Sequence, residues 1–238
     1  IVEHLLLDSR KLLFPASSIF FALSGPRRNG NTFIPELYAK GVRCFVVNEE
    51  FTDDDSFPGA VFLHVSDVLQ ALQALTAYHR QQFNLPVIGI TGSNGKTIVK
   101  EWLYQLLQDD HSIVRSPKSF NSQVGVPLSV WQINAGHTLG IFEAGISQPD
   151  EMQRLEKIMA PSIGVVTSIG DAHSEGFLNI RQKINEKLKL FVRSDVLIYC
   201  ADNPDLNEAV NLFAGNVRNV DDFTLFSWSR KESATLQV

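Results

Sequence analysis

A glycine-rich segment between residues 85 and 102 carries the side chains best suited to chemistry. The apolar run over 85–90 predicts a buried strand, and an amphipathic helical pattern follows the loop. Backbone N–H groups in such a loop, beside a helix N-terminus, bind phosphate oxygens. Lys96 would reach the outer phosphates of a nucleoside triphosphate, and the Thr97 hydroxyl would ligate Mg²⁺. The predicted phosphate-binding residues are Gly92, Ser93, Asn94, Gly95, Lys96 and Thr97.

This loop is a variant of the usual phosphate-binding pattern. The strict pattern places a glycine five residues before Gly95, where this sequence has Ile90; the nearest glycines are Gly89 and Gly92. A glycine-rich turn with a solvated lysine is the alternative interpretation. The strand before the loop and the helix after it favour the phosphate site.

Two polar residues follow later strands. Glu143 ends the apolar run 139–142, at the edge where ligands gather in open α/β sheets, and its carboxylate is suited to Mg²⁺. The alternative is a strand-end glutamate in solvent. His173 follows the strand predicted over 162–169, and taken alone it is more often a structural histidine. We expect both to converge with Thr97 on one edge of the sheet.

Lys187 lies on or beside the apolar face of a helix predicted over 180–191. It comes three residues after Ile184 and four before Phe191. A lysine whose stem crosses the apolar surface to reach water would explain this position. The alternative is a desolvated, neutral amine, because burial lowers the pKa of a lysine. Such an amine could add CO₂ and become an anionic carbamate beside Mg²⁺.

The predicted elements divide the chain into two α/β domains, residues 1–84 and 85–238. The first is a small mixed α/β domain that ends in a linker over 79–82. In the second, strands alternate with helices, which predicts a P-loop NTPase-like, mostly parallel sheet with flanking helices. The expected elements of the first domain are strands at 18–23, 43–48 and 60–65 and helices at 33–40 and from 68. Those of the second, after the glycine loop and its helix, are strands at 138–143, 162–169, 195–200 and near 217–226, and helices at 150–159, 179–191 and 204–213.

Composition restricts the classes of function. The chain has 238 residues, 44% of them hydrophobic, a net charge of −5 and no long basic run, so a general nucleic-acid surface is not expected. No apolar run reaches membrane-spanning length. Cys44 and Cys200 lie in strand-like runs and are expected to be buried thiols, which fits a cytoplasmic protein. The sequence starts at Ile1 and ends amid β-like sequence, so we expect a fragment of a longer protein.

Several segments, in this order along the chain, resemble the Mur ligase family, the ATP-dependent amide-bond ligases of peptidoglycan precursor synthesis. They are DSR at 8–10, FFALSGPRRNGNTFI at 20–34, GITGSNGKT, SFNSQVGVPLSV, IFEAG, VTSIGDAHSEGF and the lysine of INEKLKLF. The resemblance implies an acid–amino-acid ligase that acts through an acyl phosphate. Its implied ligands are ATP, Mg²⁺, UDP-N-acetylmuramoyl-tripeptide and D-Ala-D-Ala.

The resemblance also implies roles for individual residues. Lys96 would contact the ATP phosphates, and Thr97 and Glu143 would hold Mg²⁺. His173 and a carbamylated Lys187 would serve a second Mg²⁺, so Lys96, Lys187 and His173 are the implied catalytic residues. Asn121 and Ser122 would line the reaction cleft. The UDP part of the substrate would bind Ser9, Arg10, Ser24, Gly25, Asn29, Gly30 and Asn31.

Some positions depart from the family pattern. Ile98 stands where a second hydroxyl residue is common, and Ser122 replaces an asparagine. Asn29 replaces an aspartate and Asn31 replaces a histidine. Lys189 stands where the family often has a glutamate. These departures resemble a branch whose members can be fused to an alanine racemase. The family's C-terminal domain, which would carry the D-Ala-D-Ala site, is not recognised, so we expect this chain alone to be inactive. The alternatives are another Mur-type or folylpolyglutamate-type ligase, or a non-catalytic P-loop nucleotide-binding module.

Overall fold

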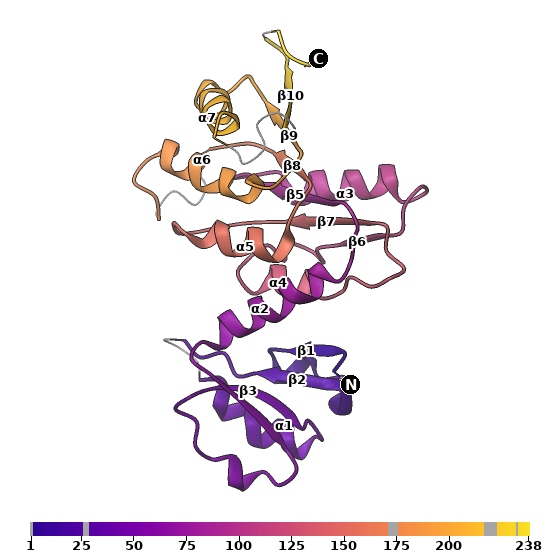
Figure 1. Cartoon of the computed structure of the whole chain (residues 1–238), viewed down its shortest axis with the longest axis vertical. Helices are drawn as coiled ribbons and strands as arrows, with labels where there is room; N and C mark the ends of the chain where they lie inside the picture. Colours follow the sequence, from indigo (N-terminus) through magenta and orange to yellow (C-terminus); the bar gives the residue numbers. More distant parts are fainter. Residues whose placement is uncertain (1, 26–28, 171–175, 217–222, 232) are drawn as a thin grey trace. The chain divides into compact units, whose positions relative to one another are not determined.

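The computed structural model describes residues 2–25, 29–170, 176–216, 223–231 and 233–238. It divides into two compact α/β units, Ile1–Leu75 and Thr76–Val238 (Figure 1). The division falls inside helix α2 (Val68–Gln81). A functional boundary at residue 84 stays a prediction.

The linker predicted over 79–82 is wrong. Helix α2 continues to Gln81, and Arg80 is buried. The Arg80 guanidinium donates hydrogen bonds to the carbonyls of Met159 (3.1 Å), Phe83 (2.7 Å) and Leu85 (3.1 Å). The run 79–82 resembles a linker in sequence because it is polar. The partners that bury Arg80 are backbone carbonyls, which the pattern of side chains does not reveal.

The first unit is a four-stranded parallel sheet in the order β1-β2-β3-β4. Successive side chains point to opposite faces. Phe20 and Phe45 therefore pack with helix α1 (Ile34–Ala39) on one face, while Ile19 and Val46 pack with the start of α2 on the other. The strands are β1 (His4–Leu6), β2 (Ser18–Phe21), β3 (Cys44–Asn48) and β4 (Val61–Val65), and short 3-10 helices cover Ser9–Lys11, Pro15–Ser17, Gly30–Phe33 and Asp54–Ser56.

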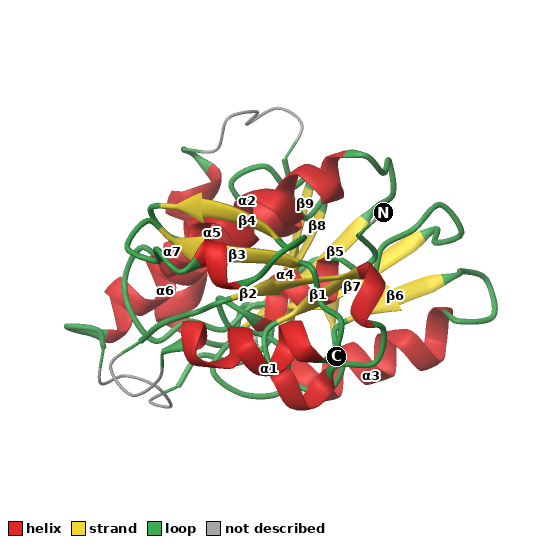
Figure 2. Ribbon diagram, turned by 90° about the horizontal axis from the view of Figure 1, so that it is seen from below, coloured by secondary structure: helices red, strands yellow, loops and turns green. Residues whose placement is uncertain are grey.

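The second unit is a seven-stranded sheet in the order β11-β10-β9-β8-β5-β7-β6, and its strands pair in parallel. Figure 2 shows β9, β8, β5, β7 and β6 of this sheet. Strand β5 lies between β7 and β8, so the carboxyl ends of these three strands meet at one edge. The strands are β5 (Val87–Thr91), β6 (Ile113–Arg115), β7 (Leu139–Glu143), β8 (Ile163–Val166), β9 (Val196–Cys200), β10 (Thr224–Ser229) and β11 (Leu236–Gln237).

Helices cover both faces of this sheet. Ile88 and Ile90 of β5 pack with α3 (Lys96–Leu107), whereas Val87 faces the larger core that the other helices build. Those helices are α4 (Gly125–Val130), α5 (Glu151–Met159), α6 (Ile180–Leu188) and α7 (Pro204–Ala214), with a 3-10 turn at Lys189–Phe191.

The predicted parallel α/β architecture is confirmed, and the predicted helices and strands that fall on described residues lie near their expected bounds. Of the strand predicted near 217–226, residues 217–222 lie outside the described residues, and β10 begins at Thr224. Among the strands and α-helices of the described residues, sequence patterns missed four short ones, β1, β6, β11 and α4. Strands this short carry too little alternation, and α4 contains Gly125 and Pro127, which are poor helix formers. Cys44 and Cys200 are free thiols but only partly buried. No helix in the described part of the chain is long and apolar enough to cross a membrane.

Candidate active site

The glycine loop connects β5 to α3 and follows a backbone path that glycine favours. Gly92 has φ +148° and Gly95, which precedes the first turn of α3, has φ +83°. A Cβ on Gly92 would lie 2.0 Å from Thr167 Oγ1, so this position has no room for a side chain. Because α3 begins at Lys96, its first N–H groups have no partners within the helix and are available to an anion.

Polar contacts attach the loop to the segment that follows β8. The Ser93 N–H donates to the Ser168 carbonyl (2.6 Å), and Thr167 Oγ1 donates to the Asn94 carbonyl (2.6 Å). The Ser93 hydroxyl donates to the Gly170 carbonyl (3.0 Å). These contacts hold the loop in one conformation before any ligand arrives.

Lysine side chains converge on the glycine loop and on the segment after β8 that is attached to it. Lys96 Nζ and Lys187 Nζ donate to the Gly92 carbonyl at 2.9 and 3.2 Å, and Lys183 Nζ donates to the Gly170 carbonyl at 2.6 Å. Lys187 is only 4% exposed, which excludes a side chain that reaches solvent. Its burial, followed by the charges of Lys96 and Lys183, lowers its pKa to about 7. Burial also lowers the pKa of Lys96, against the opposing effect of the Glu143 carboxylate. The site is a positively charged pocket suited to phosphate.

The side-chain oxygens of Thr97 and Glu143 lie next to each other beside the glycine loop. Glu143 ends β7 with its side chain fully buried, which excludes a strand-end glutamate in solvent. Thr97 Oγ1 donates a 3.1 Å hydrogen bond to Glu143 Oε2. His173 lies outside the described residues, so its predicted convergence stays a prediction.

The donor set fits Mg²⁺. The Thr97 hydroxyl and a Glu143 carboxylate oxygen lie side by side next to the glycine loop. Among the residues described, no group of three or more His, Cys, Asp or Glu residues is arranged to hold a metal ion. Mg²⁺ is commonly bound by one or two carboxylates, with the remaining ligands supplied by water and substrate phosphates.

A cleft of about 380 Å³ opens from the loop. Asn121 and Ser122 line it together with Lys96 and Lys187, and their role in a reaction stays a prediction. The Asn121 carbonyl accepts from the Gly145 N–H (2.7 Å), which fixes this wall to the end of β7. The other lining residues are Gly92, Gln123, Val124, Gly145, Ile146, Ser147 and Glu151.

A second cavity, of about 600 Å³, adjoins the same loop at Asn94 and Gly95. Its walls are mainly apolar and include Val99, Val165 and Trp228. A flat aromatic base attached to a phosphate chain in the loop would find its complement there.

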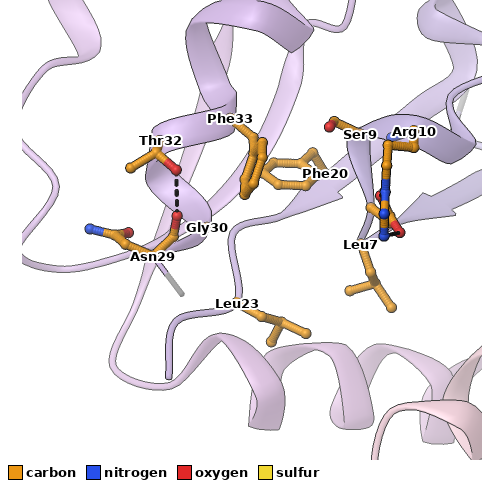
Figure 3. Close-up of a pocket in the computed structure, with 10 residues that line it drawn as sticks. Leu7, Ser9, Arg10, Phe20, Leu23, Asn29, Gly30, Thr32 and Phe33 are labelled. Carbon is orange, nitrogen blue, oxygen red and sulfur yellow. Dashed lines mark hydrogen bonds and ion pairs between the residues drawn. The ribbon is translucent and has the colours of Figure 1, made fainter. Parts of the chain in front are cut away.

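The first unit contains a cavity of about 650 Å³ (Figure 3). Of the residues predicted to bind a UDP group, Ser9, Arg10, Asn29 and Gly30 line it. Arg10 is bound to Asp8 by two side-chain hydrogen bonds of 2.8 and 2.7 Å, and these hold the pKa of the Asp8 carboxyl well below its usual range. The other lining residues are Leu7, Asp8, Phe20, Leu23, Thr32 and Phe33.

Three residues predicted for the same group are not among those that line this cavity. Ser24 Oγ donates to Asn29 Oδ1 (3.2 Å), and Asn31 Nδ2 donates to Asn48 Oδ1 (3.2 Å). Gly25 is exposed, and a Cβ added to it would meet nothing within 4 Å. Ser24 and Asn31 therefore act on neighbouring side chains, and a direct role for all three stays a prediction.

The Mur ligase middle domain family matches residues 90–231, which is more than half of the chain. The chain belongs to the Mur ligase family. Relatives named UDP-N-acetylmuramoyl-tripeptide–D-alanyl-D-alanine ligase include one from Borreliella burgdorferi, 31% identical over 84% of this chain and 46% of the relative. Another, from Bacillus subtilis, is 32% identical over 88% of this chain and 46% of the relative. The chain thus spans about half the length of the curated relatives it matches.

Solved Mur ligase structures share the fold. MurF ligase from Thermotoga maritima in complex with ADP has a TM-score of 0.82 and 25% identity over 97% of this chain and 51% of that one. MurF from Acinetobacter baumannii has a TM-score of 0.83 and 25% identity over 95% of this chain and 48% of that one. An FPGS structure from L. casei has a TM-score of 0.54 and 12% identity over 66% of this chain and 48% of that one. This is a likeness of fold alone.

Sequence reasoning about this Mur ligase domain missed two buried lysines, Lys100 and Lys183. On the glycine-loop helix, the apolar residues Trp102 and Leu106 are exposed, whereas the charged Lys100 is buried. Lys100 follows Lys96 by one helical turn, and this spacing was the one available signal that it lies near the site. Lys183 precedes Lys187 by the same interval.

Proposed function

We propose that this chain provides the UDP-substrate and ATP sites of an ATP-dependent ligase that adds D-Ala-D-Ala to UDP-N-acetylmuramoyl-tripeptide in the cytoplasm. The observation that carries the proposal is the pairing of Thr97 and Glu143 at a glycine loop faced by Lys96 and Lys187. The names of the relatives and the ADP complex of a similar structure support the substrates.

In the reaction, a carboxylate oxygen of the tripeptide attacks the γ-phosphorus of ATP. The bond from that phosphorus to the ADP oxygen breaks, giving an acyl phosphate. The amine of D-Ala-D-Ala then attacks the acyl carbon, the amide bond forms, phosphate leaves, and the nitrogen loses a proton. Most of the acceleration in such phosphoryl transfers comes from positioning and charge neutralisation.

The residues of this chain would divide that work. The N–H groups of the glycine loop and Lys96 hold and neutralise the β- and γ-phosphates, and the apolar cavity beside Asn94 receives the adenine. Thr97 and Glu143 would hold Mg²⁺, which neutralises phosphate charge when bound. Asn121 and Ser122 border the space where the tripeptide carboxylate must approach the γ-phosphate.

Lys187 has the properties needed for carbamylation. Its pKa of about 7 leaves a substantial neutral fraction near pH 7, and only the neutral amine attacks the carbon of CO₂. The amine loses one proton when it becomes neutral and a second as the new N–C bond forms, so a buried cation becomes a buried anion. With His173, that anion would serve a second Mg²⁺.

Binding measurements test the proposal. Calorimetry on this chain should show binding of Mg·ADP and of UDP-N-acetylmuramoyl-tripeptide, and no binding of a folate polyglutamate. Lys96→Ala should weaken Mg·ADP binding about 100-fold, because a charge-assisted phosphate contact is lost, and leave the UDP ligand unaffected. The exposed Lys157→Ala is the matched control. Equal Mg·ADP affinity in Lys96→Ala and the unchanged protein would refute the phosphate site.

A further inference from the structure

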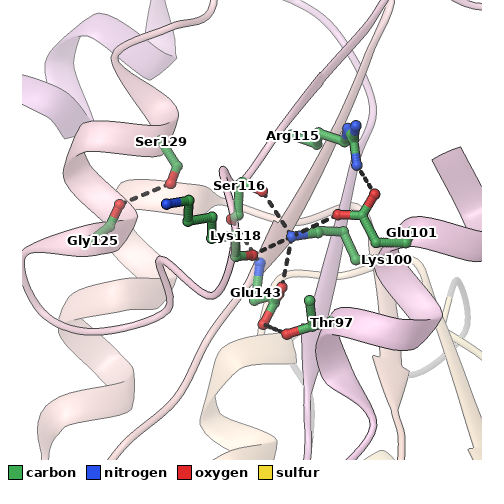
Figure 4. Close-up of polar contacts among 9 residues, drawn as sticks. All are labelled: Thr97, Lys100, Glu101, Arg115, Ser116, Lys118, Gly125, Ser129 and Glu143. Carbon is green, nitrogen blue, oxygen red and sulfur yellow. Dashed lines mark hydrogen bonds and ion pairs between the residues drawn. The ribbon is translucent and has the colours of Figure 1, made fainter.

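Lys100 is a fully buried cation directly behind the proposed metal ligands. It lies on α3, and oxygen atoms from three parts of the unit surround its amine (Figure 4). Nζ donates to the carbonyls of Ser116 (2.8 Å) and Lys118. It also lies 2.9 Å from Glu143 Oε1 and 3.2 Å from Glu101 Oε1.

Of the two carboxylates, Glu143 is the buried partner of Lys100. Its side chain is inaccessible to solvent, whereas that of Glu101 is 38% exposed and also pairs with Arg115. Charges at the surface are screened by water and salt, so the contact with Glu143 dominates. Glu143 Oε1 has no other polar partner in the described part of the structure and accepts no hydrogen bond of good geometry, so this contact is mainly ionic.

The two oxygens of Glu143 therefore have separate partners. Oε1 faces Lys100 and Oε2 faces Thr97. This division fixes the rotation of the carboxylate and directs Oε2 toward the glycine loop. Without a cation at Oε1, a carboxylate with no solvent contact would hold an uncompensated charge, which is strongly destabilising in a protein interior.

Lys100 also fixes the turn that leads to the cleft. The carbonyls it binds belong to residues 116 and 118, and the Ser116 hydroxyl accepts from the Glu143 N–H (3.1 Å). Three residues after Lys118, Asn121 begins the wall of the cleft. One amine thus joins the phosphate-loop helix, the metal carboxylate and the cleft wall.

We propose that Lys100 is the resident counter-ion of Glu143, a positioning residue that keeps the metal site assembled between turnovers. While no metal is bound, it balances the buried carboxylate and holds Oε2 toward Thr97. Once Mg²⁺ binds, the two cations share one carboxylate and repel each other, so Lys100 weakens metal binding and favours release of Mg·ADP. This inference rests on the proposed role of Glu143 as a Mg²⁺ ligand.

The test compares metal-free stability with metal affinity in this chain saturated with ADP. Lys100→Met keeps the length of the side chain and removes its charge. Its melting temperature in EDTA should fall by about 10 °C, because a buried ion pair is broken. Its affinity for Mn²⁺, titrated by electron paramagnetic resonance, should rise about ten-fold, because the repulsion is gone. A role in packing alone would lower the melting temperature and leave the Mn²⁺ affinity unchanged.

Two further variants show whether a change in Mn²⁺ affinity comes from the Lys100–Glu143 pair or from the neighbouring Glu101. Glu101→Gln removes the exposed carboxylate next to Lys100 and should leave the Mn²⁺ affinity unchanged. The double variant Lys100→Met/Glu143→Leu replaces both charges and should recover most of the metal-free stability while losing Mn²⁺ binding. If Lys100→Met fails to fold, Lys100→Gln, which keeps a donor without the charge, is measured in its place.

The outcomes are distinct. Unchanged or weaker Mn²⁺ binding in the Lys100 variant, beside normal binding in the unchanged protein, overturns the counter-ion role and leaves the proposed function intact. Absence of Mn²⁺ binding in the unchanged protein with ADP would overturn both. Tighter Mn²⁺ binding together with lower metal-free stability is the result we expect.

Discussion

Lys96 and Lys187 donate hydrogen bonds to the same carbonyl oxygen, that of Gly92, at 2.9 and 3.2 Å. Two amines that share one acceptor cannot both carry full charge cheaply away from water. Lys187 is the more buried of the two, and its pKa falls to about 7, through burial first and the charge of Lys96 second.

Carbamylation of Lys187 should therefore depend on pH around neutrality. In ¹³C-bicarbonate, a carbamate carbon signal should grow between about pH 6 and 8, because the neutral amine becomes the major form above the pKa of about 7. Nuclear magnetic resonance of Lys187→Met should lack the signal. Lys189→Met is the control, since Glu186 raises the pKa of Lys189 and keeps that amine protonated. A signal that survives in Lys187→Met would assign the carbamate to another residue.

Gly92→Ala should weaken nucleotide binding. The new Cβ would meet Thr167 Oγ1 at 2.0 Å, on a backbone with φ +148°, so the loop must move. We expect at least a ten-fold loss of Mg·ADP affinity by calorimetry. At Gly95 a Cβ would find only Thr167 Cβ at 3.9 Å, so Gly95→Ala should cost only about 1 kcal/mol of strain. Adding Thr167→Ala to Gly92→Ala should recover part of the affinity; no recovery would show that the backbone angle alone sets the loss.

The parts of the site that sequence could predict are those encoded within one segment. The strand, glycine loop and helix around Lys96 follow each other directly, and β7 and β8 end in recognisable apolar runs at Glu143 and Thr167. The burial of Lys187 could also be predicted, because its three- and four-residue spacing from Ile184 and Phe191 placed it on a buried helical face.

Lys100 could not be recognised in the same way. Its carbonyl partners lie 16 and 18 residues along the chain, on a turn that no periodicity marks. The helical pattern of α3 was also ambiguous, because Trp102 and Leu106 are apolar yet exposed, while the charged Lys100 is buried. A buried charge is stable only when charged or hydrogen-bonding partners surround it. These partners come together only when the chain folds, so the sequence pattern does not show them.

Arg80→Met should destabilise the second unit although Arg80 is not among the residues that line the cleft. The guanidinium satisfies three carbonyls in the interior, and its loss leaves them without these donors. We expect the free energy of unfolding in urea to fall by about 3 kcal/mol, with ligand affinity of the folded protein unchanged. The exposed neighbour in Gln81→Met is the control and should change stability by less than about 0.5 kcal/mol. A similar small effect for Arg80→Met would show that water replaces the guanidinium.

Arg10→Ala should weaken binding of UDP-N-acetylmuramoyl-tripeptide and leave Mg·ADP binding unchanged. Arg10 lines the cavity of the first unit, and its guanidinium is free to exchange the Asp8 carboxylate for a ligand diphosphate. Loss of such a charge-assisted contact should cost about ten-fold in affinity by calorimetry. The melting temperature should stay nearly constant, because the Arg10–Asp8 pair is exposed and such pairs contribute little.

Two companion variants decide whether Arg10 acts on the ligand. Asp8→Asn removes the competing carboxylate, so the UDP ligand should bind as tightly as before or more tightly. Lys11→Ala removes an adjacent charge that does not line the cavity and should have little effect. If Arg10→Ala and Lys11→Ala weaken binding equally, the contribution is general electrostatic attraction. A loss confined to Arg10→Ala, with no loss in Asp8→Asn, would place the diphosphate on the guanidinium.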